Sequence, residues 1–358
     1  MRKLAFVCSI LSFLYGAEVQ ADEALLVALT EIKQNYIEKT STEDLAVIAL
    51  KSLHKTDQKL HVANDGPRIT LYYDTKVFKN FNKPEHNQVA VWTSLVDNIV
   101  TYASQISNKI MIKDYEVYDI MIKSIVQILD EDSKYHTAFD LADENAFERK
   151  KYFSDRRIDN ILYVRLLGFS DDASTQFENT LKNNKDAQGL IIDLRGNSGG
   201  SLKAVMKIGN LLLDGGVMFE STGRDKSMNL LYEAQEKDMF EEKPIVILVD
   251  GNTASSAEIL AGALQQQSRA KLIGSTTYGK ATSQKIIKLP NDSVLMLTNA
   301  KLILPDYDFS KVGLTPDYCL NGNREFTENK KTDNCAKEDR LNYDKDIDTA
   351  VKVLKTQI

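Results

Sequence analysis

The chain has 358 residues, of which 45 are Lys or Arg and 51 are Asp or Glu, and its formal net charge at pH 7 is −6. This acidic balance gives no reason to expect nucleic acid or an anionic membrane surface as a partner. The length exceeds that of a typical single domain and allows one large core with an appended helical region.

Residues 1–21 have the pattern of a secretory signal peptide. Arg2 and Lys3 precede an apolar run, and a small-residue cleavage site ends at Ala21. The run is too short to span a membrane as a stable helix, so we expect no stable membrane anchor. The prediction is a mature chain that begins near Asp22 and is secreted across the inner membrane of a bacterium into the periplasm.

Residues 22–136 are predicted to form an N-terminal helical region. Apolar residues recur at helical spacing over 22–52, with Ser41 or Thr42 as the cap of a second helix. A further helix is expected over 118–135.

An insert over residues 56–117 is harder to interpret. Residues 68–78 alternate like a strand or a hairpin arm, and 89–112 has helical periodicity. The only tryptophan, Trp92, lies in an apolar stripe, which favours core packing over ligand stacking. The position of the insert suggests dimerisation or substrate gating.

After a polar, charged linker over residues 137–159, strands and helices alternate from 160 to 304. This order predicts an α/β core. A buried strand over 189–194 leads into a glycine-rich turn over 195–200. The turn lacks the Walker lysine and the GxGxxG pattern, so nucleotide binding is disfavoured and no cofactor is expected.

Ser255 lies at the most informative turn of the chain. The apolar run 245–249 predicts a buried strand, and small and apolar residues at helical spacing follow Ser255. Backbone N–H groups at a helix start can stabilise a developing oxyanion, so this position suits a nucleophile. On composition alone, such a Ser/Thr cluster is more often simply a helix cap.

Lys280 is the local candidate for the base, because all four histidines lie in the first 136 residues. An ordinary lysine has a pKa of about 10.4, and lowering it by about three units costs about 4 kcal/mol. Ile286, Ile287 and Leu289 are expected to supply an apolar wall around the amine. Gln284 follows Lys280 by four residues.

The C-terminal part, residues 321–358, is predicted as a loop and a closing helix. Cys319 and Cys335 most simply form a disulfide in an oxidising compartment, contributing about 3 kcal/mol. A metal site is disfavoured because neither cysteine belongs to a CxxC motif and no histidine is near. Before them, residues 294–304 are expected to form a strand pair bent near Asn299.

Three separated segments carry a resemblance to a known family: GLIIDLRGNSGG, TASSAEILAGALQ and SRAKLIGSTTYGKATSQ. They resemble the C-terminal processing peptidases, the tail-specific Ser/Lys proteases of peptidase family S41. The family pattern has a nucleophilic Ser, a Glu three residues later, a Lys twenty-five residues after the Ser and a Gln four beyond the Lys. The matching positions in this sequence are Ser255, Glu258, Lys280 and Gln284.

The resemblance covers roughly residues 25–55, 118–136 and 160–320. It implies a ClpP/crotonase-like spiral ββα catalytic core over 160–320, with an α-helical N-terminal region. It also implies an oxyanion hole formed by the N–H of Gly199 or Gly200 together with that of Ser256. Glu258 is expected to support or cap the helix start.

One departure from the family lies in the linker over residues 137–159. Most relatives carry a PDZ domain here, and this linker is too short to hold one. The module that grips a substrate's C-terminal carboxylate by strand addition is therefore expected to be missing.

The resemblance implies a serine endopeptidase with a Ser/Lys dyad that cleaves unfolded or C-terminal segments of envelope proteins. Its partners would be polypeptide substrates, with no metal and no cofactor. Two alternatives remain: a non-catalytic ligand- or protein-binding module on the same scaffold, and a protease that needs an adaptor or a homo-oligomer.

Overall fold

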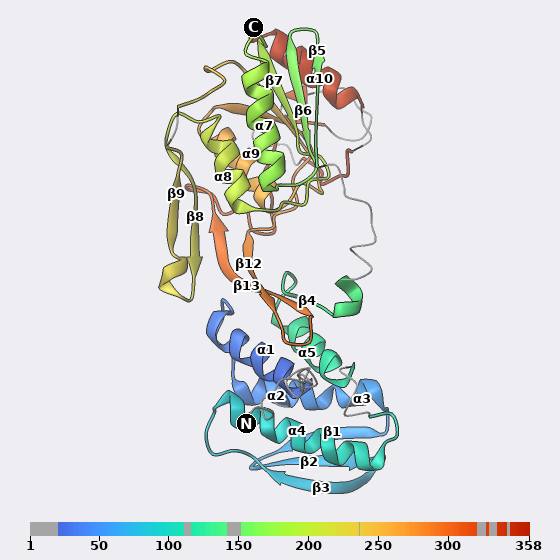
Figure 1. The fold of residues 1–358 in the computed structure, drawn as a ribbon. Coiled ribbons are helices and arrows are strands. Elements are labelled where there is room, and N and C mark those ends of the chain that lie inside the picture. The colour runs from blue at the N-terminus through green and yellow to red at the C-terminus, as the bar shows by residue number, and fades with distance from the viewer. Residues whose placement is uncertain are drawn as a thin grey trace, which may run out of the picture. The chain divides into compact units, whose positions relative to one another are not determined.

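The computed structural model describes residues 21–110, 116–141, 152–235, 237–320, 327–328, 335–341 and 344–358. The chain divides into two compact units, and Figure 1 labels most of their helices and strands. The N-terminal unit comprises Met1–Phe147 and Gln284–Thr298, and the core unit comprises Glu148–Ser283 and Asn299–Ile358. The predicted signal peptide lies outside the described residues, except for Ala21, at which the first helix begins.

The core unit is built on a seven-stranded sheet with the order β15-β14-β11-β10-β7-β6-β5. The five strands from β6 to β14 are parallel, and β5 and β15 add antiparallel edges. The strands are β5 (Phe153–Ile158), β6 (Ile161–Leu166), β7 (Gly189–Asp193), β10 (Ile245–Val249), β11 (Ala270–Gly274), β14 (Tyr318–Cys319) and β15 (Thr327–Glu328). Every residue of β7 and β10 is buried, which is typical of parallel strands covered on both faces.

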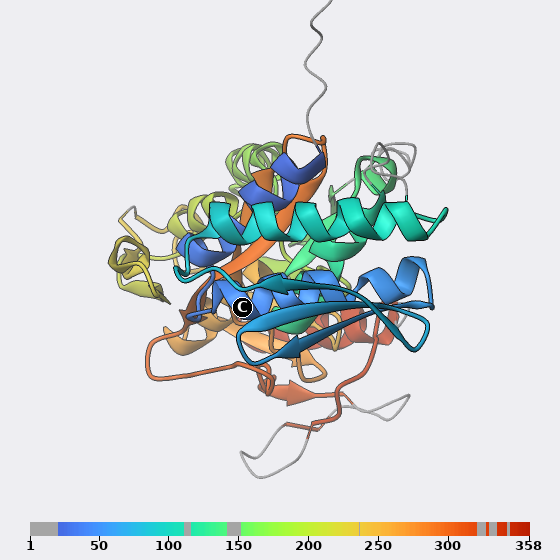
Figure 2. The same cartoon turned by 90° about the horizontal axis from the view of Figure 1, so that it is seen from below.

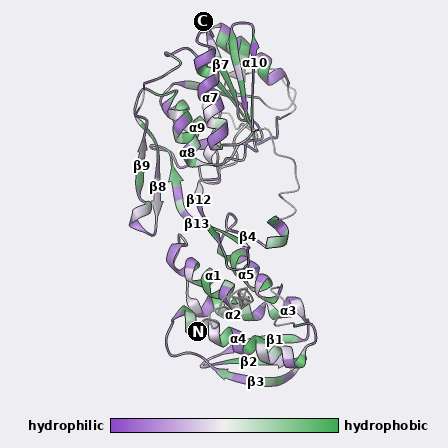
Figure 3. Ribbon diagram, in the orientation of Figure 1, coloured by the Kyte–Doolittle hydropathy of each residue, from purple (hydrophilic) through white to green (hydrophobic). Residues whose placement is uncertain are grey.

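Helices cover both faces of this sheet, and Figure 3 shows the hydrophobic residues of its strands. Leu190 and Ile192 of β7 pack in the cluster that includes α7, α8 and α9, whereas Ile191 packs in the cluster that includes α10. This alternation follows the period of two along a strand. The helices are α7 (Asp171–Asn183), α8 (Leu202–Asn210), α9 (Ser256–Gln266) and α10 (Asp344–Lys355).

A second group of strands is divided between the units: β8, β9 and the ends of β12 and β13 outside Gln284–Thr298 belong to the core unit, and the rest of β12 and β13 belongs to the N-terminal unit. The last residues of β13 pair antiparallel with β8, from Ala300 with Gly223 to Ile303 with Glu220. The elements are β8 (Val217–Gly223), η1 (Lys226–Met228), β9 (Leu230–Glu233), β12 (Thr282–Lys288) and β13 (Val294–Ile303). The predicted strand pair bent near Asn299 is wrong, because β13 is one continuous strand.

The N-terminal unit combines helices with a small antiparallel sheet, β1-β2-β3, which Figure 2 shows. Ser41 is the cap of α2, and its hydroxyl accepts a hydrogen bond from the N–H of Asp44. The elements are α1 (Ala21–Asn35), α2 (Thr42–Lys51), α3 (Leu53–Thr56), β1 (Leu60–Asp65), β2 (Arg68–Tyr73), β3 (Lys76–Asn82), α4 (Val89–Ile106), α5 (Glu116–Leu129) and β4 (Lys134–His136). The region predicted as helical therefore also contains a sheet.

The linker predicted over residues 137–159 ends in a strand of the core sheet. β5 pairs with β6 from Phe153 with Leu166 to Ile158 with Ile161. Its polar, charged side chains suit an edge strand, which is why composition indicated a linker. Residues 142–151 of that prediction lie outside the described residues.

The predicted disulfide between Cys319 and Cys335 is confirmed, with a distance of 5.6 Å between the two Cα atoms. Among the described residues, no helix combines the length and the apolar character needed to cross a membrane.

Trp92 tests the packing of the N-terminal unit, because it is 2% exposed and its neighbour Val91 on α4 is 42% exposed. We expect Trp92→Ala to lower the free energy of unfolding of this unit by about 3–5 kcal/mol, as for other buried aromatic side chains. Val91→Ala is the matched control and should change it by less than about 0.5 kcal/mol. Urea unfolding followed by far-UV circular dichroism measures both, and equal effects would contradict the assigned packing.

Candidate active site

Ser255 lies between β10 and α9 in an unusual backbone conformation. Its φ is 56° and its ψ is −122°, a region that residues other than glycine rarely occupy. Such a conformation costs on the order of 1–3 kcal/mol and persists only where the surroundings hold it. The strand-to-helix turn over residues 250–255, called here the nucleophile turn, leaves Ser255 half-buried at the start of α9.

The side chain of Glu258 holds this conformation. It is fully buried in the first turn of α9, and its Oε2 accepts a hydrogen bond of 2.9 Å from the N–H of Ser255. The same oxygen accepts one of 2.9 Å from the N–H of Lys280. Its Oε1 accepts from the N–H of Gly279 at 2.6 Å and from the hydroxyl of Thr277 at 2.5 Å. One carboxylate therefore binds the backbone of both the serine and the lysine predicted to react.

The charge state of Glu258 depends on two opposed effects. Burial raises the pKa of its carboxyl above the ordinary value of 4.5. The hydrogen bonds from Thr277 and from the three amides favour the charged form and lower the pKa, but less strongly. The carboxylate is thus desolvated but has four donors.

Lys280 is the last residue of the segment 277–280, whose backbone is hydrogen-bonded to Glu258 and to Lys311. Besides the contacts to Glu258, the carbonyl of Gly279 accepts a hydrogen bond of 2.8 Å from the N–H of Lys311. Gly279 has a φ of 91°, and a Cβ there would lie 2.8 Å from the carbonyl carbon of Lys311. Only glycine fits this position, and the close packing fixes where Lys280 begins.

The predicted apolar wall around Lys280 is wrong for Ile286, whose side chain is exposed, and stays a prediction for Ile287 and Leu289, which belong to the N-terminal unit. Ile286 is 70% exposed, whereas Ile287 and Leu289 pack in the hydrophobic core of the N-terminal unit. The alternation of β12 explains the difference, because neighbouring strand residues point to opposite faces. Gln284 is half-buried on β12 and belongs to the N-terminal unit, so its hydrogen bond to Lys280 stays a prediction.

The glycine-rich turn over residues 195–200 lies against the nucleophile turn. A Cβ on Gly199 would lie 2.9 Å from the Cβ of Ser255, and one on Gly200 would lie 2.4 Å from the carbonyl oxygen of Phe169. The φ angles of these glycines are 108° and 136°. A side chain at position 199 would push the two turns apart, and one at position 200 would clash with the backbone of Phe169, which explains the two glycines.

The three amides predicted for an oxyanion hole differ in their hydrogen bonding. The N–H of Gly199 donates to Oδ1 of Asn197 at 2.8 Å. The N–H groups of Gly200 and Ser256 donate to no residue that the structure describes, and the Ser256 hydroxyl donates to the carbonyl of Gly200 at 2.9 Å. Gly200 and Ser256 are therefore better placed than Gly199 to bind an anion.

Asn197 is a site residue that the sequence analysis missed. It is fully buried, and its side-chain Nδ2 donates a hydrogen bond of 3.0 Å to the carbonyl of Leu166. Its backbone carbonyl accepts a hydrogen bond of 2.9 Å from the N–H of Ala254. The sequence offered one signal for this role: Asn197 lies inside a glycine-rich turn. In such turns an Asn side chain commonly accepts a hydrogen bond from the backbone N–H of the residue two positions later.

Over the described part of the chain, no group of three or more His, Cys, Asp or Glu side chains is arranged to hold a metal ion. The arrangement offers a serine at a helix start, a lysine bound to the same carboxylate, and two N–H groups beside the serine.

Comparison with known proteins shows what the core is similar to. Residues 160–320 match the model of peptidase family S41. A carboxy-terminal-processing protease of Bartonella bacilliformis is 33% identical over 165 residues, which cover 44% of this chain and 38% of that protein. A carboxyl-terminal-processing protease of Picosynechococcus is 37% identical over 158 residues, which cover 43% and 38%. The matches thus span less than half the length of these curated relatives.

Two solved structures share the mixed α/β fold. The photosystem II D1 C-terminal processing protease has a TM-score of 0.50 and 16% identity, covering 83% of this chain and 92% of that one. A lipoprotein from Streptococcus agalactiae has a TM-score of 0.57 and 17% identity, covering 95% and 97%. At these identities the likeness concerns the fold alone.

Glu258→Gln tests the carboxylate that joins the two segments. One oxygen becomes an NH₂ group that faces backbone N–H donors, so we expect the free energy of unfolding to fall by about 2–4 kcal/mol. The control is Glu233→Gln, an exposed side chain on β9, which should change it by less than about 0.5 kcal/mol. Urea unfolding at neutral pH compares the two, and a neutral Glu258→Gln would contradict the assigned contacts.

The raised pKa of Glu258 predicts a pH dependence of stability. Between 4.5 and the raised value, the folded chain keeps a proton that the unfolded chain has released. The stability of wild type relative to Glu258→Gln should therefore be greatest below about 4.5 and fall as pH rises through the raised pKa. Urea unfolding of both proteins from about pH 4 to 8 measures the difference. A difference that grows with pH would mean that the four hydrogen bonds outweigh burial.

Proposed function

We propose that this chain, whose residues 160–320 match the model of peptidase family S41, is a serine endopeptidase of the C-terminal processing type. The observation that carries the proposal is the buried Glu258 carboxylate, which binds the backbone of both Ser255 and Lys280. A binding module has no need of a serine held in a strained conformation beside a lysine, whereas a nucleophile and its base need a fixed geometry.

In the proposed reaction, the Ser255 hydroxyl attacks the scissile carbonyl. Neutral Lys280 takes the hydroxyl proton and later gives it to the leaving amine. Gln284 would orient the amine of Lys280 through a hydrogen bond. Water then attacks the acyl-enzyme by the same general-base route and releases Ser255.

The developing oxyanion would lie between the N–H groups of Gly200 and Ser256. Both groups are without a protein partner in the described part of the chain, and the Ser256–Gly200 hydrogen bond keeps their turns together. The Gly199 N–H serves instead to hold the turn through Asn197. Preorganised donors of this kind typically supply the largest single contribution to catalysis.

The finer fold and the setting are also proposals. The strand and helix order of the core supports the spiral ββα arrangement of ClpP and crotonase. The signal-like residues 1–21 support secretion into the periplasm, where unfolded or C-terminal segments of envelope proteins would be the substrates. Because no PDZ domain fits in the linker, substrate recognition would rest on another surface, an adaptor or a homo-oligomer.

The test is cleavage of unfolded β-casein by residues 22–358, followed by intact-mass spectrometry. We expect cleavage by wild type and a loss of at least about 10³-fold in Ser255→Ala and Lys280→Ala. Lys280→Arg should lose as much, because arginine keeps its charge and cannot accept a proton. The exposed Lys203→Ala is the control and should cleave normally.

Retention of activity in Lys280→Arg would contradict the assigned base. A wild type that cleaves nothing between about pH 6 and 9, whereas it binds a labelled ligand or partner tightly, would favour the binding module. Cleavage that begins only when an added envelope protein is present would favour the protease that depends on an adaptor.

A further inference from the structure

A short segment near the C-terminus crosses the loops that carry the proposed active site. Residues 335–341, called here the C-terminal strap, follow the loops after β10 and β11. The carbonyl of Glu338 accepts hydrogen bonds from the N–H of Gly251 at 2.6 Å and from the hydroxyl of Ser275 at 2.7 Å. The N–H of Thr276 donates to the carbonyl of Ala336 at 2.9 Å. The strap therefore binds the loop before Ser255 and the loop before Lys280.

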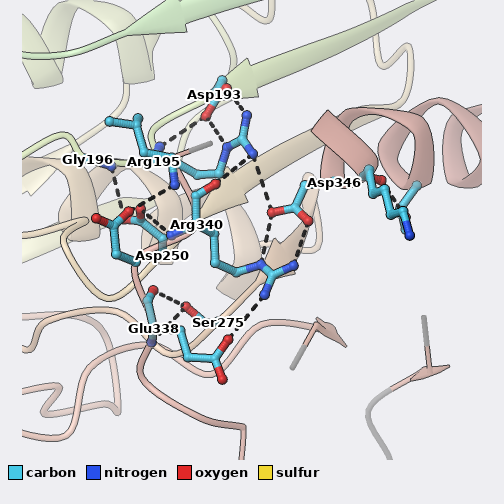
Figure 4. A network of polar contacts seen from close by, with 12 residues as sticks. Asp193, Arg195, Gly196, Asp250, Ser275, Glu338, Arg340 and Asp346 are labelled. Carbon is cyan, nitrogen blue, oxygen red and sulfur yellow. Dashed lines mark hydrogen bonds and ion pairs between the residues drawn. The ribbon is translucent and has the colours of Figure 1, made fainter. Parts of the chain in front are cut away.

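A buried ionic network lies behind the strap, as Figure 4 shows. Arg340 binds Asp346 of α10 through two hydrogen bonds, of 2.9 and 2.8 Å. Arg195 donates to the same Asp346 at 3.3 Å, to the carbonyl of Arg340 at 3.0 Å, and twice to Asp193 at 2.9 and 2.6 Å. Arg195 opens the glycine-rich turn, so the network joins that turn to the strap and to α10.

Asp250 connects the strap to both turns of the active site. Its Oδ2 accepts a hydrogen bond of 3.1 Å from the N–H of Arg340. Its Oδ1 accepts hydrogen bonds from the N–H of Gly196 at 3.0 Å, the N–H of Asn252 at 3.0 Å and the hydroxyl of Thr253 at 3.1 Å. One carboxylate thus holds the glycine-rich turn, the nucleophile turn and the strap in a fixed relation (Figure 4).

Stability alone does not explain this network, because removing five charged side chains from water costs free energy that their pairing only partly returns. Asp193, Asp250 and Asp346 are fully buried, and Arg195 and Arg340 are each 2% exposed. Buried ion pairs are often no more stabilising than apolar residues of the same volume, but their directional hydrogen bonds specify one geometry. The groups they orient here are the glycine-rich turn, which carries the N–H of Gly200, and the nucleophile turn, which leads directly into the N–H of Ser256; neither N–H has an acceptor among the described residues.

We propose that Asp250 is a positioning residue through which the C-terminal strap fixes the glycine-rich turn against Ser255. This inference rests on the proposed peptidase function. Oxyanion donors act mainly in the transition state, so loosening their turns lowers kcat and leaves KM nearly unchanged. The strap is therefore part of the active-site scaffold.

Asp250→Asn tests the proposal because the asparagine side chain has the same shape as the aspartate and keeps one of its two oxygens. The new NH₂ group replaces Oδ2, which accepts only from the N–H of Arg340, so the contact between residue 250 and the strap is lost. We expect kcat to fall by about 10²-fold, with KM changed by less than about threefold. Hydrogen exchange of peptides that span residues 196–200 and 250–256 should become faster than in wild type.

Asp238→Asn is the matched control. Asp238 is a buried carboxylate that accepts from the N–H groups of Phe240 and Glu242 and from Arg269. Its partner Arg269 directly precedes β11 and also donates to the carbonyl of Lys243 just before β10, so Asp238 lies at the opposite ends of these strands from the two turns. We expect it to lower stability while leaving kcat and the exchange of both turns at wild-type values.

A double variant distinguishes a positioning role from a general loss of stability. Arg340→Met combined with Asp346→Leu replaces the buried Arg340–Asp346 pair by apolar side chains, while Arg195 keeps Asp193 and the carbonyl of residue 340 as partners. The double variant should unfold near the wild-type midpoint but still show reduced kcat and faster exchange in the glycine-rich turn.

The proposal fails if Asp250→Asn keeps its kcat, if only KM changes, or if Asp238→Asn loses as much kcat. A wild type without any peptidase activity would contradict the proposed function instead. In that case, the hydrogen exchange of Asp250→Asn and Asp238→Asn still decides whether the strap holds the two turns, because this measurement needs no turnover.

Discussion

The carboxylate of Glu258 is the constraint on which the candidate site depends. A buried charge without partners would be very unfavourable, so four donors must converge on it. Three of these donors belong to the segment that carries Lys280, and the fourth is the N–H of Ser255. Satisfying one side chain therefore imposes both the strained conformation of Ser255 and its closeness to the lysine segment.

The parallel sheet brings these segments within reach of one carboxylate. β7, β10 and β11 are neighbours and run in the same direction, so the loops at their carboxyl ends meet at one edge. Those loops carry the glycine-rich turn, Ser255 and Lys280. Asp250 and the C-terminal strap then join the same three loops from behind, through hydrogen bonds that again converge on buried carboxylates and carbonyls.

Local patterns predicted elements well where burial was uniform. The sequence correctly predicted the strands β7 and β10 and the amphipathic helices. A strand buried on both faces is a continuous apolar run, and a helix buried on one side has apolar residues at helical spacing, so both patterns are visible in the sequence. β5 was missed because an edge strand takes its backbone hydrogen bonds from β6 and needs few apolar side chains. The expectation that Ile286 would shield Lys280 was wrong, because alternation along β12 turns Ile286 toward solvent and Ile287 into the core of the N-terminal unit.

By itself, the sequence determined the strand-to-helix turn at Ser255, the spacing of Ser255, Glu258 and Lys280, and the two cysteines that form the disulfide. These features depend on neighbours along the chain or on a spacing that a family shares. The tertiary structure decided that Asn197 takes the N–H of Gly199 and that Asp250 meets Arg340. It also decided that Arg195 shares Asp346 with Arg340. Such partners are far apart in the chain or lie inside irregular turns, and hydrophobic periodicity carries no information about which buried donor meets which acceptor.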